Sequence, residues 1–176
     1  MAQETDTSAR TGSPLSLGLD LSTQSLTGVL IDPESGSVLD SRSLSYVDDP
    51  RLTGFGIDHR SFLVPPRREG EADQPPALFL AALDALFSDM RRDGVEMDRI
   101  GVVNISAQQH GHVYVDGRFA ENLAKLGGDA ENPHEPGGGR QGDLVDTLQE
   151  SFSYGTAPIW MTSDTEEEAA HIRRQA

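Results

Sequence analysis

Asp20 lies two residues before a short run of hydroxyl and amide side chains, Ser22, Thr23 and Gln24. A carboxylate at the end of a strand can hold Mg²⁺, directly or through water, and a tight hydroxyl-rich turn offers N–H and O–H groups to phosphate oxygens. This combination suits phosphoryl transfer, in which a protein mostly positions the reactants and neutralises charge. The alternative interpretation is a polar strand residue that leads into an ordinary hairpin turn.

A second polar group, Ser106–Gly111 (SAQQHG), directly follows the apolar segment Ile100–Ile105. In open α/β sheets, ligands gather beyond the carboxyl ends of strands. Gln109 and His110 can both donate and accept hydrogen bonds, which fits a polyhydroxylated ligand. The alternative is a polar turn with a structural histidine. A metal site at His110 and His112 is not predicted, because no carboxylate or further histidine lies at a suitable spacing.

The third candidate is the segment Ala157–Thr165 (APIWMTSDT). Trp160 could form the wall of a pocket, and Thr162 and Asp164 could bind hydroxyl groups. The alternative places Trp160 in the core and uses Asp164 or Thr165 to cap the helix predicted to begin near Thr165.

Composition excludes several classes of function. The 176 residues include 29 acidic and 14 basic side chains, a formal net charge of -15. This balance argues against nucleic-acid binding, against a nuclease and against a polybasic membrane-surface module, all of which need clustered Lys and Arg. There are no cysteines, so thiolate chemistry is excluded, and no apolar run approaches the ~20 residues that span a bilayer. Residues 1–13 are polar, without the apolar core of a signal peptide, and predict a disordered tail on a cytoplasmic protein.

Hydrophobic patterning predicts the elements that position these groups. Leucine alternates with polar or small residues in LSLGLDLS, which predicts a strand over Leu15–Ser22 with Asp20 on the face opposite the leucines. Further strands are predicted at Leu26–Ile31 and, nearer an edge, at Val38–Val47. Short turns would join the three into an antiparallel meander.

The remaining chain predicts helices around that meander. Pro75 and Pro76 open an amphipathic helix that runs through Met90, with Gly94 as its left-handed stop. The apolar segment Ile100–Ile105 then has the pattern of a buried parallel strand, which implies a mixed sheet covered by helices. The other predicted segments are a short strand at His112–Asp116, a mobile loop at Gly117–Gly142 and a helix at Asp143–Phe152.

Three motifs in this order resemble the FGGY family of carbohydrate kinases, within the actin/hexokinase/Hsp70 superfamily. They are LGLDLSTQSLTGVLID (Leu17–Asp32), SAQQHGHVYV (Ser106–Val115) and APIWMTSDT (Ala157–Thr165). The second has the Gln-His-Gly form of eukaryotic-type xylulose kinases. The resemblance implies a ribonuclease-H-like α/β fold, a mixed sheet with flanking helices that forms an incomplete first domain.

The resemblance also implies roles for individual residues. Asp20 matches the family's Mg²⁺ and phosphate aspartate, and the adjoining Ser22, Thr23 and Gln24 would contact ATP. The pair Gln109–His110 matches the residues that hydrogen-bond the sugar.

The sequence departs from the family pattern in two ways. The family's sugar-binding aspartate falls on Thr162 here, and the nearest carboxylate is Asp164. Either Asp164 takes over that role through a local shift, or this member has an altered substrate preference or has lost activity. The family's catalytic base and its second, nucleotide-binding lobe both lie later in the chain than residue 176. The resemblance therefore implies that residues 14–176 are the sugar-binding, N-terminal part of an ATP-dependent kinase of a ketopentose such as xylulose. We expect this chain alone, as a fragment, split or decayed gene, to be inactive without its C-terminal lobe; the alternative is a non-catalytic sugar-binding or regulatory module.

Overall fold

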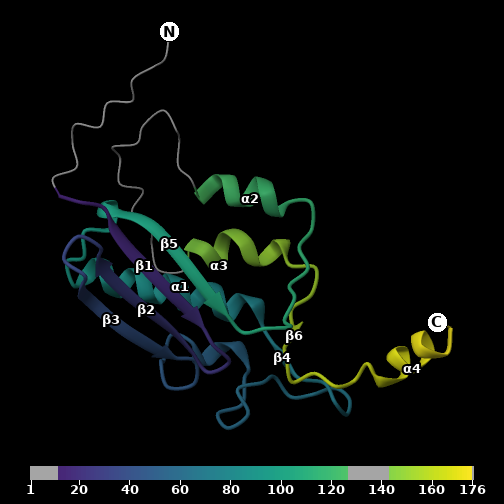
Figure 1. Ribbon diagram of the computed structural model, residues 1–176. Helices are drawn as coiled ribbons and strands as arrows, with labels where there is room; N and C mark the ends of the chain where they lie inside the picture. Colours follow the sequence, from purple (N-terminus) through teal and green to yellow (C-terminus); the bar gives the residue numbers. More distant parts are fainter. Residues whose placement is uncertain (1–11, 127–142, 176) are drawn as a thin grey trace.

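A mixed four-stranded sheet organises the protein (Figure 1). The computed structural model describes residues 12–126 and 143–175. The strands follow the order β3-β2-β1-β5, with bounds β1 Leu15–Leu21, β2 Ser25–Asp32, β3 Ser37–Ser45 and β5 Ile100–Ala107. β1, β2 and β3 form the predicted antiparallel meander, and β5 runs parallel to β1.

Helix α1 (Pro76–Arg92) covers one face of this sheet. The alternating leucines of β1 and β2 point toward it, so apolar side chains from strands and helix meet in one core. The fully buried members from the two layers include Leu17, Leu26, Leu78 and Leu86. Gly94, at φ 84°, has the left-handed conformation predicted for the end of this helix.

The predicted burial of the Ile100–Ile105 strand is wrong, although its parallel pairing is confirmed. In β5, Val102, Val103 and Ile105 are 59%, 52% and 55% exposed. β5 is an edge strand, and α1 makes its main sheet contacts with β2 and β3 instead. The apolar pattern therefore belongs to a strand that nothing in the described residues covers.

The rest of the fold consists of short elements. Their bounds are β4 Asp73–Gln74, β6 Ala157–Pro158, α2 Phe119–Leu126, α3 Asp143–Leu148, α4 Glu166–Gln175, and the 3₁₀ turns Thr53–Phe55, Met97–Arg99 and Gln149–Ser151. β4 and β6 pair antiparallel as a separate two-stranded ladder. The buried carboxylate of Asp84 on α1 accepts hydrogen bonds from the backbone N–H groups of Leu144 and Val145, which fixes the first turn of α3 to α1.

Several sequence predictions for this part need correction. Helix α2 replaces the first part of the loop predicted at 117–142, because FAENLAKL contains no Gly or Pro, and Asn122 anchors it by a hydrogen bond to Ser151. The strand predicted at 112–116 is reduced to one isolated bridge, between Val115 and Phe152. The predicted tail, up to residue 11, and the remainder of the loop, 127–142, lie outside the described residues. No helix within the described ranges is long and apolar enough to cross a bilayer.

Candidate functional site

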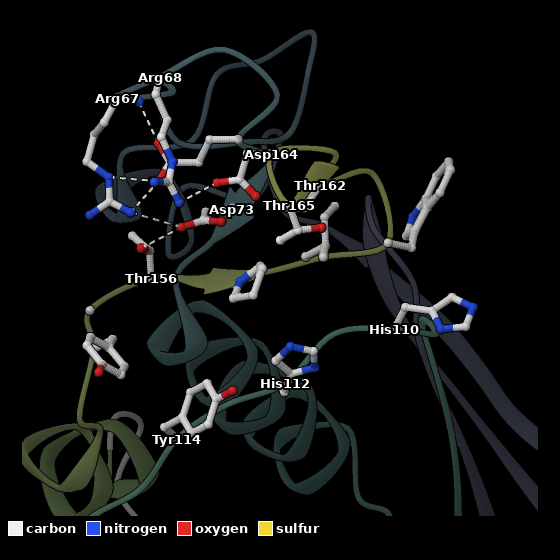
Figure 2. A pocket seen from close by; sticks show the side chains of 16 residues that line it. Arg67, Arg68, Asp73, His110, His112, Tyr114, Thr156, Thr162, Asp164 and Thr165 are labelled. Carbon is white, nitrogen blue, oxygen red and sulfur yellow. Dashed lines mark hydrogen bonds and ion pairs between the residues drawn. The ribbon is translucent and has the colours of Figure 1, made fainter. Parts of the chain in front are cut away.

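A pocket of about 780 Å³ lies beside the β4–β6 ladder. Figure 2 shows Arg67, Arg68 and Asp164 along one side of it and His110 and His112 along the other. Trp160, Thr162, Tyr114 and Tyr154 complete the side chains of interest in its wall. Two of the three sequence motifs therefore meet in this pocket.

Ion pairs fill the arginine side of the pocket. Arg68 Nη2 lies 2.5 Å from Asp164 Oδ2, and Arg67 pairs with both Glu71 and Asp73. The hydrogen bonds from Arg67 lower the pKa of the Glu71 carboxyl to about 2. Thr156 Oγ1 donates to Asp73 at 2.8 Å. The Glu71 carboxyl is therefore held as an anion, and the guanidinium groups of Arg67 and Arg68 remain exposed beside it.

Thr162 is hydrogen-bonded to the protein backbone. Its Oγ1 donates to the carbonyl of Ala72 at 2.8 Å, so its oxygen can still accept a hydrogen bond from a ligand. Asp164 lines the pocket, but its carboxylate is paired with Arg68. A Cβ at Gly70 would lie 3.1 Å from the backbone nitrogen of Asp164, so only glycine allows this close approach of the two segments.

Of the two residues predicted to hold a sugar, Gln109 and His110, one lines the pocket and the other does not. His110 is exposed, lines the pocket and has a positive φ of 60°. Gln109 is exposed and does not line it. The neighbouring Gln108 instead points into the protein, where its Oε1 accepts a hydrogen bond from Thr23 Oγ1 at 3.1 Å. Nothing in the QQH pattern distinguishes Gln108 from Gln109, so the role of Gln108 could not be predicted from the sequence.

The Ser22–Ser25 turn is closed by its own hydrogen bonds. Ser22 Oγ accepts from the backbone N–H groups of Gln24 and Ser25 and donates to the Ser25 carbonyl. The hydroxyl of Thr23 donates its hydrogen bond to Gln108. A hollow of about 510 Å³, lined by Ser22, Thr23, Gln24 and Trp160 among others, opens beside the turn. Phosphate oxygens in this hollow would meet a turn of fixed shape.

Asp20 lies apart from His110. It borders a separate hollow of about 330 Å³ on the sheet face away from α1, together with Thr27, Asn104 and Ser106. Across the described residues, no three His, Asp or Glu side chains are grouped to hold a metal ion. A lone exposed carboxylate fits Mg²⁺ only as part of a set completed by water and phosphate oxygens, which is the usual way proteins hold this ion.

Comparison with known proteins gives curated relatives but no match to any protein-family model. The chain is 31% identical over 157 residues to probable D-xylulose kinase A of Arthroderma otae, covering 89% of this chain and 25% of that protein. It is 31% identical over 155 residues to D-xylulose kinase A of Aspergillus niger, covering 88% and 24%.

The solved structures agree on the fold. Xylulose kinase from Rhodospirillum rubrum superposes with a TM-score of 0.57 at 14% identity, covering 92% of this chain and 23% of that one. The mixed sheet is thus a partial domain of the actin/hexokinase type, as predicted. The chain spans about a quarter of the length of the curated relatives it matches.

Proposed function

Because the chain is related to the N-terminal portion of FGGY-type carbohydrate kinases, we propose that residues 14–176 form the sugar-binding part of such an enzyme. The complete enzyme transfers the γ-phosphoryl group of ATP to a hydroxyl of a ketopentose such as xylulose. The similarity to D-xylulose kinases supports the reaction and the substrate class. The cytoplasmic location expected from the sequence is part of this proposal.

The observation that carries the proposal is the position of Trp160 between two hollows. Trp160 lines both the 780 Å³ pocket and the hollow beside the Ser22–Ser25 turn. Its Nε1 donates a hydrogen bond to Thr23 Oγ1 at 3.1 Å. The three motifs therefore converge on one region, as a kinase requires if a sugar hydroxyl and a phosphoryl group are to meet.

Each side chain then has a distinct task. His110 and the Thr162 oxygen hydrogen-bond sugar hydroxyls, and the rings of Tyr114 and Tyr154 pack against sugar C–H groups. The Ser22–Ser25 turn faces ATP phosphates. Asp20 helps to hold Mg²⁺, which supplies charge neutralisation when bound.

The remaining parts of the reaction are assigned to polypeptide outside this chain. A base must take the proton of the sugar hydroxyl, and a second lobe must place the γ-phosphate in line. The exposed Val103 and Ile105 of β5, on the sheet face toward α1, form the apolar surface that such polypeptide would cover.

A chimera tests the proposal. The matched quarter of Aspergillus niger D-xylulose kinase A is replaced by this chain, and D-xylulose-dependent ADP release is measured. We expect turnover by the chimera, loss of turnover with Asp20→Asn, and none from the 176-residue chain alone. A folded but inactive chimera would contradict the proposal, as would turnover by the chain alone.

The second candidate is a non-catalytic sugar-binding or regulatory module. It is favoured by Thr162 at the family's aspartate position and by the engagement of Asp164 with Arg68. This candidate predicts that calorimetry detects D-xylulose binding to the chain without ATP, while the chimera stays inactive.

A further inference from the structure

The side chain of Gln74, at the end of β4, is fully buried and joins three segments of the chain. Its Nε2 donates to the carbonyls of Thr23 and Phe62 at 2.8 and 2.7 Å. Its Oε1 accepts from Gln108 Nε2 at 2.8 Å. A side-chain amide can make four hydrogen bonds, and three are made here.

The chemistry of the partners fixes the direction of every hydrogen bond in this group. Backbone carbonyls only accept, so the Gln74 nitrogen must face them and its oxygen must face Gln108. The Gln108 oxygen is then the acceptor for the Thr23 hydroxyl, and the Thr23 oxygen accepts from the indole N–H of Trp160, which can only donate. One continuous chain of hydrogen bonds therefore runs from Trp160 through Thr23 and Gln108 to Gln74. The hydrogen bonds in such a chain polarise one another, and together they rigidify the groups that they join.

Backbone strain occurs at the two loops beside this chain of hydrogen bonds. Within the described residues, Phe62 and His110 are the non-glycine residues with positive φ, at 61° and 60°. Phe62 provides a carbonyl to Gln74, and His110 lies two residues beyond Gln108. A strained conformation persists only where its surroundings hold it, and such sites cluster where ligands bind.

We propose that Gln74 is a positioning residue that couples the Ser22–Ser25 turn to the sugar pocket. Gln74 orients Gln108, Gln108 orients the Thr23 hydroxyl, and Thr23 holds the indole of Trp160 between the two hollows. A change on either side of Trp160 is thereby transmitted to the other. The identity of the ligands rests on the proposed function; the coupling does not.

Trp160 is the one tryptophan in the sequence, so its fluorescence reports on this network without labelling. The variants are Gln74→Met and Thr23→Val, which keep size but remove hydrogen bonds, and Thr23→Ser, which keeps the hydroxyl. Gln149→Met, at an exposed glutamine, is the matched control. We expect the acrylamide quenching constant of Trp160 to rise about twofold in Gln74→Met and Thr23→Val and to stay unchanged in the other two, since each loss frees the indole.

Binding provides the second readout. D-xylulose is titrated against Trp160 emission, and we expect Kd to rise about fivefold in Gln74→Met and Thr23→Val, with wild-type values for Thr23→Ser and Gln149→Met. If circular dichroism shows that Gln74→Met does not fold, the comparison of Thr23→Val with Thr23→Ser decides.

The outcomes separate this inference from the proposed function. A wild-type chain that binds no D-xylulose contradicts the function, whereas the quenching series still decides the coupling. The inference is overturned if folded Gln74→Met and Thr23→Val quench like wild type, or if Thr23→Ser behaves like Thr23→Val. The double variant Gln74→Met/Thr23→Val provides one more test. The inference is also overturned if the change in its quenching constant equals the sum of the changes in the two single variants, because residues of one network must act together.

Discussion

Arg68 and Asp164 connect two segments that are far apart in sequence, with the guanidinium Nη2 2.5 Å from the carboxylate Oδ2. The Asp164 side chain is largely buried, whereas Arg68 is exposed. The pair, with the backbone bond from Ser163 N–H to the Gly70 carbonyl, holds the loop before β4 against the segment before α4. Arg68 thus lines the pocket, and it is also an exposed arginine after which trypsin can cleave the chain.

Asp164→Asn should loosen this loop, because the amide keeps the shape of the carboxylate but loses its charge. Trypsin cleavage after Arg68 should accelerate by up to about fivefold, the scale of a partly exposed ion pair. Mass spectrometry of the fragments over time gives the rate. Glu34→Gln, in an exposed turn, is the control. Unchanged cleavage in Asp164→Asn would show that the pair does not restrain the loop.

A second cluster fixes α1 to the loop that follows β3. Arg51 donates to Asp49 and, through both Nη1 and Nη2, to Asp89 on α1, at 2.6–2.9 Å. Hydrogen bonds from Arg51 are the largest cause of the lowered pKa values of both carboxyls. Arg51→Ala should therefore reduce the free energy of unfolding at pH 7 by about 1–3 kcal/mol, because the poorly solvated Asp49 loses its cation and Asp89 keeps only its pair with Arg92.

The sign of the pH dependence follows from these lowered values. The folded state binds fewer protons than the unfolded state, so the stabilisation is complete above the ordinary carboxyl pKa of about 3.9. It is lost as the pH falls through the lower folded-state values. Urea unfolding should thus show the wild type and Arg51→Ala converging below about pH 4. Arg60→Ala, at an exposed arginine, should match the wild type throughout; a constant gap for Arg51→Ala would contradict the assignment.

The sheet and α1 were predictable because their signals are local. Alternating leucines place Leu17 and its neighbours on one face, and a 3.6-residue period places Leu86 on the matching face of the helix. Burial of β5 was not predictable from periodicity. An apolar run such as that of β5 is typical of a strand that some element covers, but it does not say whether that element is present.

The motifs indicated where a candidate site lies, but not which contacts its single side chains make. Trp160 and Asp164 both line the pocket, and their roles toward a ligand stay predictions. The buried partners Gln74 and Gln108 were missed because a hydrogen bond between residues 34 positions apart has no sequence period. The pairing of Asp164 with Arg68 was missed for the same reason.

Gly28 on β2 faces Leu86 of α1 at close range. A Cβ at Gly28 would lie 3.0 Å from Leu86 Cδ2, and Leu86 is fully buried with little room to move. Gly28→Ala should therefore destabilise the chain by about 1–3 kcal/mol, as overpacking does. Gly18→Ala, on neighbouring β1, is the control, because its Cβ would meet nothing closer than 3.9 Å.

The clash can be isolated by a double-mutant cycle. Leu86→Ala alone should lose about 2–5 kcal/mol, as a large-to-small change in a core does. In the Leu86→Ala background, Gly28→Ala has space for its methyl group and should be neutral or stabilising. Free energies from urea unfolding give the coupling, and strictly additive values would show that the two residues do not meet.

Leu19 and Ile105 are paired in register on β1 and β5, yet Leu19 is 4% exposed and Ile105 is 55% exposed. Leu19→Ala should cost about 2–5 kcal/mol of unfolding free energy, whereas Ile105→Ala should cost less than about 1 kcal/mol, because little apolar area is buried there. Equal losses would show that β5 is covered in solution.

The exposure of β5 also predicts that the chain self-associates through this strand as its concentration rises, which sedimentation would detect. Ile105→Lys should suppress this self-association without loss of stability, because a charge on an edge strand disfavours pairing with another chain.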